Sequence, residues 1–291
     1  MKSLNYILAA VLSFGLMGCS EDKGPSGDAG WGDEPDIPVS NLTVMSYNTR
    51  HCAPYEPDEN GHGKDTPANI AGIAQVVNNK TVDVLMLQEI DSCTARSFRI
   101  DQAKEIAAGA KYPYHEFFSM MDYQGGKYGL AILSKHVIKD AVTHRLPDEI
   151  NGHKIISPGN NSVGSAVVRV AGRDISFVVA HLSLHASDRM AQVQYIFENI
   201  IPNLKQPVIF AGDLNTRPTE SVMKKIDGYG FVRTNKDPEN FTIPSINPNR
   251  ELDYIAYFPE TEFTVLSHKV IYGTTASDHL PILATLKINK K

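Results

Sequence analysis

The sequence predicts an α/β protein in which stacked β-sheets carry helices on their outer faces. Predicted strands outnumber predicted helices, about ten to four, which disfavours a simple barrel of alternating strands and helices. Several buried strands end in a polar residue, as expected when a functional site lies at one edge of a sheet. The 42% hydrophobic content supports a packed core. No Pro/Gly/Ser-rich linker divides residues 41–291, so we expect one large domain there.

Residues 1–18 have the pattern of a bacterial export signal. Lys2 precedes an apolar run from Tyr6 to Met17, which is too short for a comfortable membrane-spanning helix. The run ends in Leu16-Met17-Gly18-Cys19, which resembles a lipobox, where the cysteine is lipidated and becomes the first residue of the mature protein. The alternative is an ordinary secretory signal in which Cys19 is incidental.

Residues 19–40 are rich in Gly, Pro, Asp and Ser, and we expect them to form a flexible, lipid-anchored tether. About 20 residues of such a chain give an end-to-end distance of roughly 25 Å. Ser20-Glu21-Asp22 resembles the acidic signal that sends some Gram-negative lipoproteins to the cell surface. We therefore expect attachment to the outer membrane or cell surface through Cys19, with a periplasm-facing position as the alternative.

The strands of the domain are predicted from apolar runs that are bounded by Gly, Pro or polar residues. The runs cover residues 42–47, 82–87, 128–133, 163–170, 175–180, 207–212, 252–258, 263–271 and 282–288. Helices are predicted where apolar residues recur at helical spacing or a capping residue precedes them. They start at Pro67, after Asp101, at Ser187 or Asp188, and at about residue 219. Residues 51–66 and 145–162 are polar and rich in turn-forming residues, so we expect surface loops.

Polar side chains follow or open many of these strands. They are Asn48, Glu89, His181, Asp213 with Asn215, Asp253, and Asp278 with His279. Carboxylate and carboxamide oxygens suit a hard cation such as Mg²⁺, whereas histidines without a nearby cysteine pair do not suit a structural zinc site. Phosphoester hydrolysis uses this assortment: a cation that polarises the phosphoryl oxygen, a base for water and a cationic donor for the transition state.

The same residues lie in a series of motifs that resembles the endonuclease/exonuclease/phosphatase superfamily, in the family's order. The motifs are Ser46-Tyr47-Asn48, Leu87-Gln88-Glu89, His181-Leu182, Gly212-Asp213-Leu214-Asn215, Leu252-Asp253-Tyr254-Ile255 and Ser277-Asp278-His279-Leu280-Pro281. Arg96-Ser97 and the run Tyr128 to Lys135 resemble its bacterial metal-dependent hydrolase branch. The resemblance implies a four-layer α/β sandwich, with two mostly antiparallel sheets flanked by helices, and hydrolysis of phosphoesters with Mg²⁺ or Mn²⁺.

The resemblance also implies a role for each motif residue. Glu89 is the main metal ligand, Asn48 lies beside the metal or phosphate, and Asp278 ligates a metal directly or through water. Asp213, held by Asn215, orients or deprotonates the attacking water. Family members differ over which group is the base, so the choice between Asp213 and His279 stays open.

The histidines and one acid complete the implied site. His279 binds or protonates the phosphate, and Asp253 fixes its tautomer and keeps it cationic. His181 contacts the phosphate or the leaving group. His185, four residues further on, is a weaker candidate for substrate binding.

One position departs from the family pattern. Many nucleases of the family have an acidic residue two positions after the first Asn, where this chain has Arg50. A guanidinium cannot ligate a metal but can bind a phosphate, and the alternative is a surface Arg paired to an acid.

Cys52 and Cys93 each lie four residues after a site residue. If Asn48 and Glu89 share one site, a Cys52–Cys93 disulfide would brace its mouth, and the alternative is two free thiols.

The leading functional hypothesis is an exported phosphodiesterase that acts on a phospholipid head group, a sugar phosphate or another small phosphoester. The net charge of −5 disfavours a broad nucleic-acid surface, so no dedicated nucleic-acid partner is expected, and we expect a monomer. A nonspecific extracellular nuclease is the alternative within the class. A non-catalytic surface lipoprotein is the alternative of another class.

Overall fold

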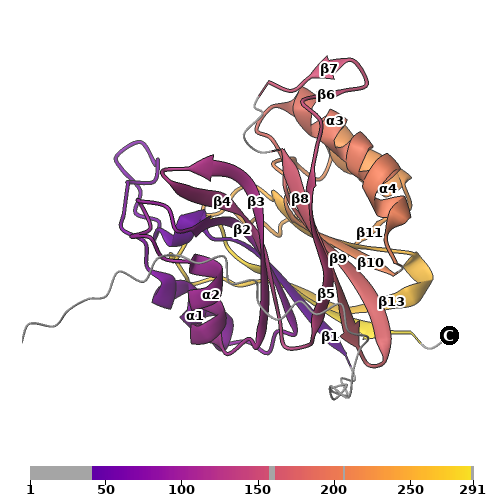
Figure 1. Cartoon of the computed structure of the whole chain (residues 1–291), viewed down its shortest axis with the longest axis horizontal. Helices are drawn as coiled ribbons and strands as arrows, with labels where there is room; N and C mark the ends of the chain where they lie inside the picture. Colours follow the sequence, from indigo (N-terminus) through magenta and orange to yellow (C-terminus); the bar gives the residue numbers. More distant parts are fainter. Residues whose placement is uncertain (1–40, 157–160, 206, 290–291) are drawn as a thin grey trace, which may run out of the picture.

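The computed structural model describes residues 41–156, 161–205 and 207–289, which form two six-stranded sheets and a two-stranded hairpin (Figure 1). The first sheet has the order β13 (Phe263–Val270), β14 (Ile282–Ile288), β1 (Leu42–Asn48), β2 (Val84–Ser92), β4 (Gly126–Ser134), β3 (Tyr114–Tyr123). The second has the order β11 (Val232–Arg233), β12 (Asp253–Phe258), β10 (Val208–Asp213), β9 (Arg173–His181), β8 (Ser162–Val170), β5 (Ile138–Arg145). The hairpin pairs β6 (Glu149–Ile150) with β7 (His153–Lys154).

The sheets pack face to face, and helices cover both outer faces (Figure 1). The central core between the sheets is built from alternate strand residues such as Val44, Met86 and Phe177. Helices α1 (Ile70–Asn78) and α2 (Gln102–Ala110) cover the first sheet, and α3 (Ala186–Tyr195) and α4 (Ser221–Gly228) cover the second. Short turns η1 (Arg50–Cys52), η3 (Ile196–Ile200), η4 (Ile201–Asn203) and η5 (Glu260–Glu262) complete the elements. The predicted four-layer α/β sandwich is confirmed.

Two parallel strand pairs bring polar residues to the same end of the sandwich. β1 and β2 are parallel with Asn48 opposite Gln88, and β9 and β10 are parallel with His181 opposite Asp213. The antiparallel strand β12 starts at Asp253, which is also opposite Asp213. Because parallel strands end at the same edge, the strand-end side chains of both sheets meet there.

Gly212 makes the close approach of β9 and β10 possible. A Cβ at this position would lie 1.8 Å from the carbonyl oxygen of Ala180, and the φ of Gly212 is 154°. A side chain here would push apart the two strands that carry His181 and Asp213.

Glu89 lies in a β-bulge of β2. The register with β4 shifts between Leu87 and Ile90, and Glu89 has a left-handed φ of 56°. A bulge redirects a side chain out of the alternation of its strand, and bulges concentrate beside active sites.

The described residues contain five strands that the apolar pattern does not predict. Three of them, β6, β7 and β11, have only two residues each, and β6 and β7 form a hairpin within the stretch 145–162 that was expected to be a loop. The other two, β3 and β5, are the outer strands on one side of each sheet, and most of their residues are partly buried or exposed. Edge strands carry many polar side chains, so their sequence resembles a loop.

Two predicted helix starts are shifted. α1 begins at Ile70 with Asn69 as its N-cap rather than at Pro67, and α3 begins at Ala186 rather than after Ser187 or Asp188. Asp188 lies within α3, where its buried carboxylate accepts hydrogen bonds from Ser183 and from the backbone of Ile156.

The predicted Cys52–Cys93 disulfide is wrong, because Cys52 is free. Its side chain is fully buried and packs in the cluster beneath α1 and α2, with Tyr47 and Leu87. Cys93 lies beyond the end of β2, where its backbone approaches Gly126. The loop that follows Asn48 is therefore held by packing and hydrogen bonds rather than by a disulfide between Cys52 and Cys93.

The predicted export signal (1–18) and tether (19–40), with Cys19, lie outside the described residues. Within the described ranges, none of the helices combines the length and the apolar character that crossing a membrane requires.

Candidate active site

Asp213 is the centre of the cluster at the strand ends. Its Oδ2 lies 3.1 Å from Asn48 Nδ2, 3.4 Å from His181 Nε2 and 3.6 Å from His279 Nε2. Its Oδ1 accepts a 2.9 Å hydrogen bond from the backbone N–H of Asn215. The side chain is almost fully buried, so these partners are what stabilises its charge. Residues from both sheets thus converge on one carboxylate.

Asn215 closes the turn after β10. It has a φ of 48°, and its side-chain amide donates a 2.9 Å hydrogen bond to the carbonyl of Leu182. This bond ties the loop after Asp213 to the loop after His181. The contact of Asn215 with Asp213 is made by its backbone N–H, so a role of its side chain in holding Asp213 stays a prediction.

His279 and Asp253 form a buried pair in which Nδ1 and Oδ2 are 2.8 Å apart. Burial by itself lowers the pKa of His279, but the carboxylates of Asp253 and Asp213 raise it to about 10. Burial raises the pKa of the Asp253 carboxyl, and the ion pair opposes that shift. At neutral pH the imidazole is therefore cationic, and Nε2 directs a proton towards Asp213.

The ligand atoms of Asp213, Asp253 and His279 lie within 4.8 Å of one another, a spacing compatible with a metal ion. A cationic imidazole has no lone pair for a metal, and both of its nitrogens face carboxylates here. We interpret this group as a proton-handling cluster rather than a metal site.

Asn48 links Asp213 to Glu89. Its Nδ2 donates to Glu89 Oε1 at 2.9 Å as well as to Asp213, and its Oδ1 accepts the backbone N–H of Arg50 at 3.0 Å. The amide nitrogen orients the two carboxylates, and the carboxamide oxygen keeps a second lone pair, so ligation of a metal by Asn48 stays a prediction. The backbone carbonyl of Asn48 is held in turn by the Ser277 hydroxyl at 2.8 Å.

Glu89 fits a divalent cation. Glu89 is half-buried, and among the described residues no Lys or Arg forms an ion pair with it. Its neighbour Asp213, joined to it through the amide of Asn48, faces the cationic His279, so the charge that a hard cation would stabilise is mainly that of Glu89.

Asp278 and Arg50 lie across the mouth from this pair. Asp278 Oδ2 is 3.9 Å from Arg50 Nε, and Asp278 Oδ1 is 3.3 Å from the Ser277 hydroxyl. The guanidinium of Arg50 also donates to the carbonyls of Pro54 and Lys64, at 3.1 and 2.8 Å. Arg50 therefore fixes the loop over residues 51–66, and its binding of phosphate stays a prediction.

Two histidines complete the set of predicted residues. His181 is buried, and in the described part of the chain its Nδ1 has no hydrogen-bond partner. His185 is exposed at the N-cap of α3, and no described contact joins it to Asp213 or Glu89. The structure therefore brings His181 into the cluster, whereas substrate binding by His185 stays a prediction.

Tyr128 is a residue that the site analysis of the sequence missed. Burial raises the pKa of its phenol, and the carboxylates of Glu89 and Asp213 raise it further, so the hydroxyl stays neutral. Tyr128 pairs with Asp91 across the sheet, two residues after Glu89. The run Tyr128 to Lys135 resembled the bacterial branch of the superfamily, which was the available signal.

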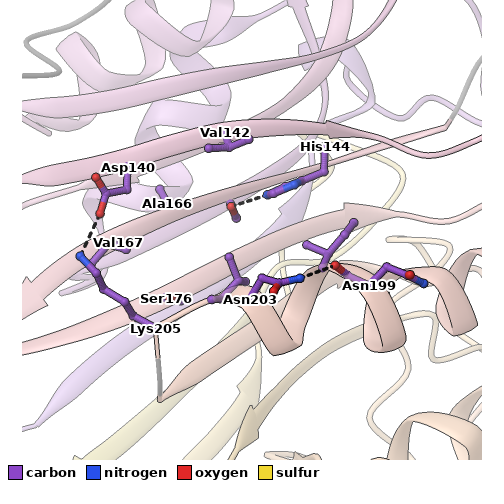
Figure 2. A pocket seen from close by; sticks show the side chains of 12 residues that line it. Asp140, Val142, His144, Ala166, Val167, Ser176, Asn199, Asn203 and Lys205 are labelled. Carbon is purple, nitrogen blue, oxygen red and sulfur yellow. Dashed lines mark hydrogen bonds and ion pairs between the residues drawn. The ribbon is translucent and has the colours of Figure 1, made fainter. Parts of the chain in front are cut away.

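A groove elsewhere on the molecule is distinct from this site (Figure 2). It has a volume of about 370 Å³ and lies between β5, β8, β9 and the turns that follow α3. His144 lies 2.7 Å from the Ser165 hydroxyl there, and Lys205 pairs with Asp140 (Figure 2). None of the strand-end residues lines it, so the catalytic candidates belong to the other site.

This fold and this set of side chains define a class of hydrolases. The chain belongs to the endonuclease/exonuclease/phosphatase family, whose model matches residues 45–279. Members of this family hydrolyse phosphoesters and generally depend on a divalent metal. A search of curated proteins finds no match to this sequence.

Solved structures show the same fold at low identity. An endonuclease/exonuclease/phosphatase from Beutenbergia cavernae DSM 12333 is 21% identical, with a TM-score of 0.68 over 86% of this chain and 72% of its own. The mannosyl-6-phosphatase of Bacteroides thetaiotaomicron VPI-5482 is 18% identical, with a TM-score of 0.61 over 84% of this chain and 99% of its own. The human nocturnin catalytic domain is 19% identical, with a TM-score of 0.61 over 88% of this chain and 96% of its own.

Proposed function

We propose that this protein is a divalent-metal-dependent hydrolase of a small extracellular phosphoester, with Mg²⁺ or Mn²⁺ as the cofactor. The observation that carries the proposal is the convergence of Asn48, His181 and His279 on the Oδ2 of Asp213, with Glu89 joined through Asn48. These groups come from both sheets, and their geometry serves no evident packing purpose. A non-catalytic binding protein would not need to keep a buried carboxylate between two histidines.

The site residues divide the chemistry between them. Glu89, with Asp278 at the mouth, would hold the cation, which when bound polarises the phosphoryl group and offsets its charge. Asp213 accepts a hydrogen bond from the attacking water, and either takes its proton or only orients it. The cationic His279, held by Asp253, donates a proton or a hydrogen bond to a phosphoryl oxygen. His181 faces the same space from β9 and donates to the phosphate or the leaving group.

The substrate that we propose is a phospholipid head group, a sugar phosphate or a similar small molecule. The acidic net charge of −5 supports this choice over nucleic acid. The mannosyl-6-phosphatase of B. thetaiotaomicron shares the fold, which supports a sugar phosphate as one candidate.

Attachment of the domain to a membrane through lipidated Cys19 is part of the proposal. The Leu16-Met17-Gly18-Cys19 motif supports it. Expression of the full chain and of Cys19→Ser in a Gram-negative host tests it: the wild type should partition with membranes and the variant with the soluble fraction. Equal partitioning of both would contradict the anchor.

The enzymatic proposal is tested with a substrate panel of phosphomonoesters, phosphodiesters, sphingomyelin and DNA, each with Mg²⁺ or EDTA. We expect turnover of a small ester that EDTA abolishes and that Glu89→Ala reduces by about 100-fold or more. Glu105→Ala is the matched control, since Glu105 is an exposed acid on α2. Metal-independent turnover, or equal activity of the two variants, would contradict the mechanism. DNA as the best substrate would favour the nuclease alternative.

A further inference from the structure

Arg96 follows β2 beside the proposed active site, and hydrogen bonds hold two of the three nitrogens of its guanidinium. Its Nε and Nη2 bind Asp91 in a bidentate pair, with distances of 2.7 and 2.8 Å. Asp91 is fully buried and also accepts the Thr94 hydroxyl at 2.8 Å. A planar guanidinium held by two parallel hydrogen bonds has little freedom to turn, so Arg96 is preorganised.

Two tyrosines hold the guanidinium from its faces. Arg96 Cζ lies 4.5 Å from the ring centroid of Tyr123 and 5.6 Å from that of Tyr128. Burial, and then the carboxylates of Glu89 and Asp213, raise the pKa of the Tyr128 phenol. Across the sheet Tyr128 pairs with Asp91 and Gly129 with Ile90, so Arg96 lies beside the bulge of β2 that carries Glu89.

The turn after Asn48 borders Arg96 from the other direction. Burial lowers the pKa of His51 to about 4, and the Arg96 cation is the next cause. His51 belongs to η1, which follows β1 directly. Arg96 is bound to β2 through Asp91, and η1 packs against β2, so this arginine and the turn that follows Asn48 are neighbours.

The remaining nitrogen of the guanidinium is available. In the described residues, Arg96 Nη1 makes no hydrogen bond, and the side chain is 26% exposed. Arg50, the other arginine at the mouth, donates both Nη atoms to loop carbonyls. Arg96 therefore offers a fixed, charged guanidinium with one nitrogen left for a ligand.

We propose that Arg96 is a specificity-determining residue whose Nη1 binds the extra anionic oxygen of a phosphomonoester dianion. The assignment rests on the proposed phosphoester hydrolysis at Glu89 and Asp213. A phosphodiester has an alkyl group where a monoester has this charged oxygen, so it gains nothing from the donor. The inference narrows the substrate class to phosphomonoesters, of which a sugar phosphate is one.

The test uses two esters with the same leaving group, p-nitrophenyl phosphate and methyl p-nitrophenyl phosphate, with purified full-length protein and Mg²⁺. Arg96→Gln should lower kcat/KM for the monoester by roughly 10- to 100-fold, mainly through KM. The methyl ester should change by less than about 3-fold, within the range of indirect effects. Arg96→Lys keeps the positive charge but not the planar, two-pronged donor geometry of the guanidinium. Its kcat/KM for the monoester should therefore lie between those of Arg96→Gln and the wild type.

Controls separate recognition from folding. Lys127→Gln removes one positive charge beside Tyr128, from a half-exposed side chain that pairs with Asp122, and should leave the ratio of the two substrates unchanged. Arg96→Gln leaves the buried Asp91 unpaired, so the double variant Asp91→Asn/Arg96→Gln is measured beside it, with thermal unfolding of each. A well-folded variant in which both esters lose activity equally would overturn the inference. If the wild type hydrolyses neither ester and no other phosphoester, the proposed function itself fails.

Discussion

Glu251 is a buried carboxyl group two residues before Asp253, and Glu251→Gln should stabilise the protein above neutral pH but not in acid. Glu251 is only 4% exposed, and its Oε1 accepts a 2.6 Å hydrogen bond from Asn235. Burial is the main cause that raises the pKa of Glu251 to about 7, and the nearby Asp253 carboxylate raises it further. Gln has the same shape and keeps the acceptor for Asn235.

The magnitude follows from the proton that Glu251 holds in the folded state. The pKa rises from 4.5 in the unfolded chain to about 7 in the folded protein, so folding costs about 3 kcal/mol more above pH 7 than below pH 4.5. The free energy of unfolding of the wild type therefore falls as the pH rises from 4.5 to about 7, and the loss is complete above pH 7. Glu251→Gln lacks the titration, so its advantage over the wild type appears in the same window.

Urea denaturation of both proteins at pH 4.5, 6 and 8 measures the difference. We expect the variant to be up to about 3 kcal/mol more stable at pH 8 and equal to the wild type at pH 4.5, with an intermediate gain at pH 6. Exposed Glu239→Gln is the control for a general charge effect. An equal gain at pH 4.5 and pH 8 would refute the argument, because a packing effect does not titrate. So would the absence of any gain at pH 8.

Two further predictions concern the ends of the central strands. Gly212→Ala should destabilise the fold by about 3 kcal/mol, because its Cβ would lie 1.8 Å from the carbonyl oxygen of Ala180. The control in thermal unfolding is Gly228→Ala, whose Cβ would meet nothing within 4 Å. Equal unfolding midpoints of the two variants would contradict the packing argument. Asp253→Asn should lower the pKa of His279 from about 10 by more than about 2 units, since the carboxylate of Asp253 is the largest cause that raises it. NMR titration of His279 in EDTA-treated protein checks this, and an unchanged pKa would show that Asp253 does not hold the cation.

The elements with long apolar runs could be predicted from the sequence. β10, with the run Val208 to Ala211, is buried along its whole length, and the apolar runs of β1, β2, β8 and β9 likewise reflect near-continuous burial. β3 and β5 could not be predicted, because an edge strand has one partner and a half-exposed face, so its residues do not need to be apolar. The start of α3 was misplaced because Asp188 forms tertiary hydrogen bonds instead of capping its helix.

The candidate site was predictable as a set of residues, and its geometry was not. The sequence itself shows where a polar residue ends an apolar run, as at Asn48 and Asp213. The amide of Asn48 joins Glu89 to Asp213 only because the bulge in β2 redirects the Glu89 side chain. The strand propensities of the residues around Glu89 do not predict this bulge. The engagement of Arg50 by the carbonyls of Pro54 and Lys64 also depends on how its loop folds back.

The sequence by itself determined the buried central strands, the order of the polar residues along the chain and their chemical types, because apolar runs and residue chemistry are local properties of the chain. Only the tertiary structure decided which of these residues meet, because contacts between residues as distant as Asn48 and Asp213 arise from the packing of two sheets. The same packing kept Cys52 in the core away from a disulfide. It also brought Arg96 and Tyr128 beside Glu89, although neither belongs to the strand-end pattern.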